Sequence, residues 1–157
     1  MPPLGGGMEI NMKFYKLEPE IAGEIGESSK IEYENGKIKK IIFLEYLFSD
    51  WLGDELLSTH PCHIVTENLK KDISANNLTG VKFQKIKKTF SDEFIELNIS
   101  TDIPEFVQIV CDNFYEDKNE NALQDFYVNR YKELIVSESA LKVIKKHTLN
   151  NCLIEEI

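Results

Sequence analysis

Apolar and polar residues alternate along much of this chain, and this pattern predicts β-strands. The clearest case is a pair of runs, residues 30–34 and 37–46, on either side of Asn35-Gly36. Asn-Gly between two such runs is a strong signal for a β-hairpin, because a type I′ turn needs positive φ at both central residues. We therefore expect a hairpin here, with the apolar run 41–44 buried on both faces.

Shorter apolar or alternating runs predict further strands. We expect them at residues 13–17, 62–65, 81–90, 105–111, 126–136 and 149–157. Segments rich in Gly or in polar residues separate these runs. They predict a loop at 20–26, a turn followed by one helical turn at 50–58, and an exposed loop at 112–125.

Capping residues predict three short helices. Thr66 is a good N-cap for a helix over residues 67–75, a brief helix starts at residues 91–93, and Ser137 caps a last helix over residues 138–147. Strands outnumber helices and do not strictly alternate with them. We therefore expect an α+β fold, with a mixed, mostly antiparallel sheet and two or three short helices.

The length of 157 residues fits one domain with a sizeable core, and 42% of the residues are hydrophobic. We expect residues 12–157 to form this domain and residues 1–11, rich in Gly and Pro, to be a flexible leader that is not a secretory signal. No apolar run approaches the roughly 18 residues of a membrane span, so no membrane partner is expected. Three widely spaced cysteines are typical of free thiols in a reducing cytoplasm, which is the expected location.

The net charge of −9 is unevenly distributed. Residues 68–90 hold six Lys against Asp72 alone, a net +5, whereas residues 91–129 hold ten acids against Lys118 alone, a net −9. An acidic surface repels phosphate backbones, which argues against nucleic-acid binding. It would speed association with a basic protein, or it would simply keep the chain soluble, and the charge alone leaves both interpretations open.

The stretch between residues 41 and 69 contains no Lys or Arg, and it holds the only Trp of the chain. Trp51 stands in Asp-Trp-Leu-Gly-Asp-Glu, residues 50–55. A Trp in such a setting is either a core anchor beside a tight turn or an exposed aromatic in an acidic patch that binds a basic partner. Asp50, Asp54 and Glu55 would form that patch, or they would form a plain solvated turn.

Two groups of residues could carry chemistry instead. His60, Cys62 and His63 offer two imidazoles and a thiol, but neighbours along a strand point to opposite faces, and no zinc-ligand spacing is present. Asp50 and Asp54 could form an acid/base pair or a cation site, although they match no EF-hand spacing. We expect no catalytic residue, no metal and no cofactor. The alternative is a small hydrolase-like enzyme or a metal-binding protein that uses one of these groups.

Five segments in order along the chain carry a family resemblance. They are FYKLEPEIAG (14–23), DWLGDELL (50–57), PCHIVTENL (61–69), LTGVKF (78–83) and LIVSESAL (134–141). Together these segments resemble a family of bacterial immunity proteins from polymorphic toxin systems, formerly a domain of unknown function. His60 and His63 depart from the apolar or aromatic residues expected in relatives, which weakens the metal interpretation further.

The resemblance implies a small cytoplasmic protein that binds and neutralises a cognate toxin domain and so protects the cell that makes it. It implies no catalytic residue and no cofactor. The acidic surface would cover a basic toxin face, such as that of a nuclease, which must itself attract phosphate. The predicted partner-binding residues are Asp50, Trp51, Asp54, Glu55, Glu116, Asp117, Glu120 and Asp125.

Overall fold

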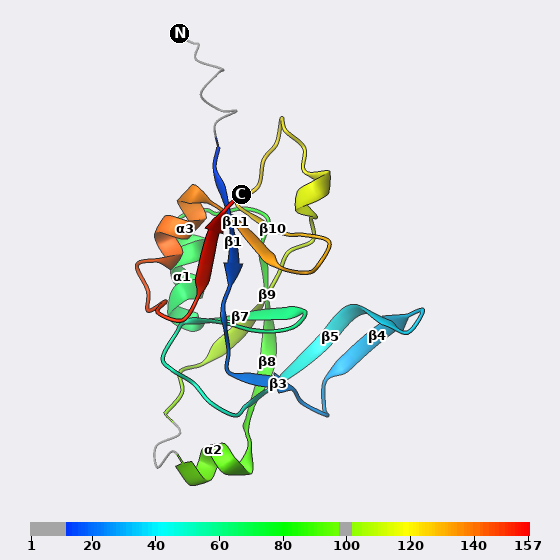
Figure 1. Ribbon diagram of the computed structural model, residues 1–157, viewed down its shortest axis with the longest axis vertical. Coiled ribbons are helices and arrows are strands. Elements are labelled where there is room, and N and C mark those ends of the chain that lie inside the picture. The colour runs from blue at the N-terminus through cyan, green and yellow to red at the C-terminus, as the bar shows by residue number, and fades with distance from the viewer. Residues whose placement is uncertain (1–11, 98–101) are drawn as a thin grey trace.

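The computed structural model describes residues 12–97 and 102–157, and the expected leader lies outside these residues. The described part is built of strands with three short helices and one 3-10 turn (Figure 1). The strands are β1 Phe14–Glu18, β2 Glu20–Ile21, β3 Gly23–Ile25, β4 Lys30–Glu34, β5 Lys37–Phe48, β6 Leu56–Thr59, β7 Cys62–Thr66, β8 Lys82–Phe90, β9 Phe106–Val110, β10 Phe126–Val128, β11 Leu134–Ser137 and β12 Leu153–Glu156. The helices are α1 Glu67–Ala75, α2 Asp92–Leu97 and α3 Glu138–Ile144, and the 3-10 turn is η2 Tyr115–Asp117.

The strands form two sheets. A four-stranded antiparallel sheet has the order β10-β11-β1-β12. A larger sheet has the order β2-β6-β7-β9-β8-β5-β3, with β4 paired to β5. Within it the β2–β6 and β5–β8 pairs are parallel, and the other pairs are antiparallel. The predicted α+β class with mostly antiparallel sheets is confirmed.

One hydrophobic core joins helices α1 and α3 to both sheets. Leu69 and Ile73 of α1 lie in the same buried cluster as Ala140 and Ile144 of α3 and Leu17 of β1. These side chains are almost completely removed from water, and burying one aliphatic side chain of this size contributes roughly 1.5–3 kcal/mol. The cluster therefore fixes α1, and with it the start of that helix, against the rest of the domain.

A second core, rich in aromatic residues, lies against the larger sheet. Phe48 at the end of β5 packs on Phe106 with ring centroids 5.7 Å apart. The hydroxyl of buried Tyr46 donates to the carbonyl oxygen of Ser58 at 2.8 Å and accepts from the backbone N–H of Ala22 at 3.0 Å. These contacts fix the end of β5, where the turn between β5 and β6, which carries Trp51, begins.

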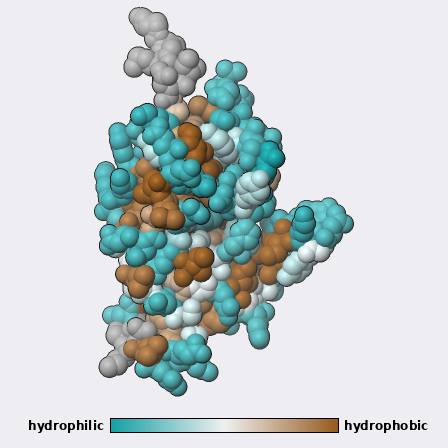
Figure 2. All heavy atoms as spheres, viewed as in Figure 1, coloured by the Kyte–Doolittle hydropathy of each residue, from teal (hydrophilic) through white to brown (hydrophobic). Residues whose placement is uncertain are grey.

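The predicted hairpin is confirmed: β4 and β5 meet at Asn35 (φ +53°) and Gly36 (φ +77°). It projects from the body of the domain, and apolar side chains are visible along it (Figures 1 and 2). Tyr33 is 61% exposed and Ile42 is 50% exposed. The expectation that residues 41–44 are buried on both faces is therefore wrong for Ile42. Strand β5 pairs with β8 only from Leu44 onward, so Ile42 lies in the projecting part of the hairpin, where one face stays open to solvent.

The predicted helix caps are confirmed. The hydroxyl of Thr66 accepts from the N–H of Leu69, and the hydroxyl of Ser137 accepts from the N–H of Ala140, both at 3.1 Å. Helix α3 ends at Ile144, three residues earlier than expected. None of the helices in the described segments is long and apolar enough to cross a membrane.

Three predictions of local structure are wrong. Residues 20–26, expected as a loop, contain β2 and β3, because pairing with β6 and β5 overrides the weak local strand preference. Residues 56–59 form β6 instead of a helical turn, since they pair along β7. Residues 126–136 are two strands, β10 and β11, separated by a turn in which Lys132 takes φ +66°.

Candidate partner-binding site

The turn between β5 and β6 holds Trp51 in a defined orientation. Gly53 has φ +110°, a conformation that side chains disfavour, and this lets the chain reverse just after the indole. The Trp51 Nε1–H donates to the carbonyl oxygen of Asp54 at 2.8 Å, and the ring meets the Phe106 ring edge to face with centroids 6.3 Å apart. Trp51 is therefore half-buried, with its position fixed and part of its surface left accessible.

The sequence places Asp54 on an exposed acidic edge, but the structure buries it completely. Its carboxylate accepts from the backbone N–H of Asn150 at 2.9 Å and from that of Asn151 at 2.7 Å, and it also accepts from the Asn151 side-chain amide at 3.1 Å. These three donors satisfy the hydrogen-bonding capacity of the buried carboxylate. Asp54 therefore tethers the segment before β12 and does not face a partner.

Glu55 is largely engaged inside the protein as well. Its carboxylate accepts from the Thr66 hydroxyl at 2.6 Å and from the Thr148 N–H at 3.2 Å, and His147 Nδ1 lies 3.2 Å away. His147 Nε2 in turn lies 2.9 Å from Asp72 Oδ2. Burial opposes ionisation of Glu55, but the hydrogen bonds outweigh it and hold its pKa below the ordinary value. Glu55 is thus a negative charge of fixed orientation at the edge of the Trp51 turn.

A shallow pocket of about 400 Å³ opens beside Trp51, and none of the described residues that line it is a Lys or Arg. Its three charged groups are all carboxylates: Glu55, Glu67 at the first position of α1, and Glu105 just before β9. The described residues that line it are Trp51, Gly53, Glu55, Thr66, Glu67, Asn68, Pro104 and Glu105. We call it the Trp51 pocket. An aromatic side chain and three carboxylates together suit a cationic side chain.

Two lysines lie close to the Trp51 pocket without lining it. Lys88 Nζ contacts Glu105 Oε2 at 2.5 Å, and Lys70 Nζ lies 4.0 Å from Glu67 Oε1. Both side chains of the Glu67–Lys70 pair are partly exposed, so water screens this pair, whereas in the other pair Glu105 is 75% exposed but Lys88 only 19%. Glu67 can therefore exchange Lys70 for a cation of a partner at little cost. Lys88 is largely buried, but its Nζ also donates to the carbonyl oxygen of Ile103 at 2.9 Å, so it keeps one acceptor if Glu105 turns to a cation of a partner.

The second predicted group lies in the exposed loop 112–125. Glu116, Asp117 and Glu120 are exposed, as expected. Glu116 accepts from the Arg130 N–H at 3.1 Å, and this hydrogen bond is the main reason that its pKa is lowered. Asp125 is half-buried, and its carboxylate accepts from the side chain of Ser137 and from the backbone of Thr79. The role of Asp125 is to join two segments of the chain.

The structure does not bring the two predicted groups together. Residues 50–55 lie in the lower half of the molecule in Figure 1, whereas the loop 112–125, yellow in that view, lies in the upper half. Two members of each group line a pocket, and the two pockets are separate: Glu116 and Asp117 line the one in the upper half. Of the predicted residues, Trp51 and Glu55 line the Trp51 pocket, and Asp50 is exposed on the same turn.

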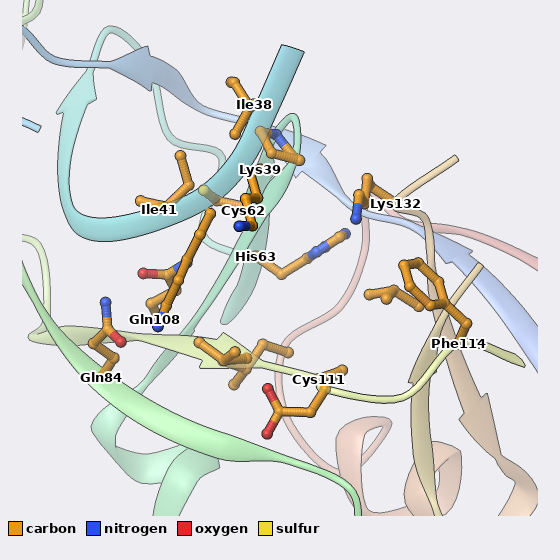
Figure 3. A pocket seen from close by; sticks show the side chains of 16 residues that line it. Ile38, Lys39, Ile41, Cys62, His63, Gln84, Gln108, Cys111, Phe114 and Lys132 are labelled. Carbon is orange, nitrogen blue, oxygen red and sulfur yellow. The ribbon is translucent and has the colours of Figure 1, made fainter. Parts of the chain in front are cut away.

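The His60–Cys62–His63 cluster does not have the features of a reactive site. Burial raises the pKa of Cys62 to about 12, and burial, together with the charge of His60, lowers the pKa of His63 to about 4. Cys62 and His63 leave β7 in different directions, as the alternation predicts (Figure 3). Among residues 12–97 and 102–157, no three His, Cys, Asp or Glu side chains are grouped to hold a metal ion.

Glu67 and Glu105 are pocket residues that the sequence reasoning missed. Glu67 follows the N-cap Thr66, so its place at a helix start could be predicted, but its position near Trp51 could not. Glu67 and Glu105 lie side by side because β7 and β9 are adjacent strands. Just beyond this strand pair, the Glu67 N–H donates to the carbonyl oxygen of Glu105 at 3.0 Å. A scan against protein-family models and a search of curated proteins both find no match to this chain.

Proposed function

We propose that this chain is an immunity protein that binds and neutralises a cognate bacterial toxin domain. The observation that carries the proposal is the Trp51 pocket, where a fixed indole and three carboxylates meet and none of the described lining residues is a Lys or Arg. The five segments that resemble the immunity family support it, because one of them, residues 50–57, forms the turn that holds Trp51. The protein would act in the cytoplasm and protect the cell that makes the toxin.

A basic toxin would be bound in two stages. The net charge of −9 attracts a basic face over a distance and speeds the encounter. An Arg or Lys of the toxin then enters the Trp51 pocket, lies against the indole and pairs with Glu67 and Glu105. A cation held over an aromatic ring contributes roughly 0.5–2 kcal/mol, depending on how far it is desolvated. A nuclease domain fits this description, because its own substrate site must be basic.

Co-expression tests the proposal. The toxin-like domain encoded beside this gene is expressed in a bacterial host with and without this chain. We expect the chain to restore growth and to co-purify with the toxin, and we expect Trp51→Ala combined with Glu105→Lys to lose both effects. Toxicity that persists although both proteins are soluble and the neighbouring domain is the active toxin would contradict the immunity function.

A matched variant controls for net charge. Glu34→Lys changes the charge by the same amount as Glu105→Lys. Glu34 ends β4, at the tip of the β4–β5 hairpin that projects from the body of the domain (Figure 1), and it does not line the Trp51 pocket. We expect Glu34→Lys to protect the host as well as the unmodified chain does. Equal loss of protection by the two variants would mean that overall charge, and not the Trp51 pocket, determines binding.

A further inference from the structure

A second hollow lies apart from the Trp51 pocket, where the first half of β5 faces β7 and β9. It is a cavity of about 420 Å³, within the size range of small-molecule sites. Its wall is largely apolar, with Ile38 and Ile41 of β5 among the lining residues. Figure 3 shows its length: Gln84 and Gln108 lie at one end, Phe114 and Lys132 at the other, and Cys62 and His63 between them.

One end of this cavity holds a buried polar atom without a partner. Gln108 is only 5% exposed, and its Oε1 has no hydrogen-bond partner among the described residues. The neighbouring Gln84 does not supply one, since its Nε2 donates to the carbonyl oxygen of Ile42 at 2.8 Å. A buried, unpaired carboxamide oxygen lowers stability, so a folded protein that retains one requires an explanation. A ligand that donates an N–H or O–H inside the cavity provides it.

The middle of the cavity offers a second polar group. His63 is 7% exposed, and no described residue forms a hydrogen bond with its ring. Burial lowers its pKa to about 4, so the imidazole is neutral near pH 7 and presents one donor and one acceptor. His63 points toward Lys132 and not toward Gln108 (Figure 3). The two buried polar groups therefore serve different parts of an elongated ligand.

Lysines line this cavity although the chain as a whole is acidic: Lys132 lies at the end away from Gln108, and Lys39 and Lys40 of β5 also line the cavity. Lys132 Nζ lies 4.7 Å from the centre of the Phe114 ring, and no carboxylate of the described residues pairs with it. Asp112, the one acid in the lining, is paired with Lys82 at 2.7 Å. Lys132 also has φ +66°, a turn position that favours Gly or Asn. The turn itself therefore does not explain the choice of Lys.

We propose that this cavity binds a small organic anion that carries a hydrogen-bond donor at its far end. The negative group pairs with Lys132, the body lies against Ile38 and Ile41, and the donor reaches Gln108 Oε1. A carboxylate and a phosphate share the required charge, so either can provide the anionic end. This site is independent of the Trp51 pocket and of the proposed toxin partner.

Calorimetric titration of the purified full chain tests the site. The first probe is orotate, which carries a carboxylate and ring N–H donors. The second is uridine 5′-monophosphate, which carries a phosphate and one ring N–H donor. Uridine and inorganic phosphate are the controls, because each lacks one of the two features. We expect at least one probe to bind with a dissociation constant below 1 mM and at least tenfold more tightly than either control. The proposal is overturned if neither probe binds, or if inorganic phosphate binds as tightly as the better probe.

Three variants separate binding from folding. Gln108→Leu should weaken the better probe at least tenfold and raise the melting temperature of the empty protein, because it removes the unpaired oxygen. Lys132→Asn should weaken binding at least fivefold with little change in melting temperature, since Asn tolerates positive φ. Lys71→Asn, an exposed lysine of α1, should leave binding unchanged. If Gln108→Leu lowers the melting temperature and leaves binding intact, Gln108 is structural and the proposal fails.

Discussion

At the scale of single residues, the acidic turn contains carboxylates of two kinds. Asp50 is exposed, whereas Asp54 is fully buried and accepts three hydrogen bonds from Asn150 and Asn151. The two residues are the same type, four positions apart, beside the same Trp. Their difference arises from a segment almost a hundred residues later in the chain, so it could not be predicted from the local sequence.

The two aspartates should therefore respond differently to the same substitution. Asp54→Asn replaces an acceptor oxygen by a donor that faces backbone N–H groups, and we expect it to lower the free energy of unfolding by roughly 1–3 kcal/mol. Asp50→Asn should change the free energy of unfolding by less than about 0.5 kcal/mol, as is usual at the surface. Urea denaturation measures both values. Equal effects would contradict the structural role of Asp54.

His63 should make stability depend on pH. Its pKa is lowered to about 4 in the folded protein, mainly by burial, against about 6.5 when unfolded. The unfolded chain therefore binds the proton first, so the contribution is fully present above pH 6.5 and is lost as the pH falls toward 4. From pH 7 to pH 5 this group alone should reduce stability by about 2 kcal/mol.

Comparison with a variant isolates this contribution. His63→Gln has no proton to gain, so its free energy of unfolding should fall less than that of the unmodified chain between pH 7 and pH 5. Urea denaturation at both pH values gives the two differences. The same dependence on pH in both proteins would mean that His63 is not buried in its neutral form.

At the scale of elements, local signals predicted the caps and the β4–β5 hairpin, because each depends on residues next to it in the sequence. The wrong predictions concern segments whose structure depends on distant partners. Strands β2 and β3 form because they pair with β6 and β5. The turn between β10 and β11 has Lys132 at its positive-φ position, and a Gly at that position would have predicted the turn. The alternating patterns therefore identified strands better than the links between them.

The cap of α3 provides a test at this scale. Ser137 is fully buried, and its hydroxyl accepts from the Ala140 N–H and donates to Asp125 Oδ1 at 2.7 Å. We expect Ser137→Ala to lower the free energy of unfolding by roughly 1–2 kcal/mol, because it removes the cap and leaves Asp125 with one donor fewer. Ser139→Ala, at an exposed position of the same helix, is the control and should change it by less than about 0.5 kcal/mol.

At the scale of the whole molecule, the candidate site is created by topology. β7 and β9 are neighbours in the larger sheet, and this brings Glu105 beside Glu67 and the Trp51 turn. The sequence indicated Trp51 and Glu55 as candidate residues, since both stand in a stretch without basic residues. It could not select Glu67 and Glu105 from the other acids, or exclude Asp54, because those distinctions require the fold.

The measurement that tests the account most directly is the affinity for the purified cognate toxin domain at several salt concentrations. For the unmodified chain we expect affinity to fall as salt rises, because exposed carboxylates meet a basic face. Glu105→Lys should weaken binding at least tenfold at low salt, while Glu34→Lys should change it less than threefold. Affinity that is insensitive to salt and to Glu105→Lys would contradict binding through the Trp51 pocket.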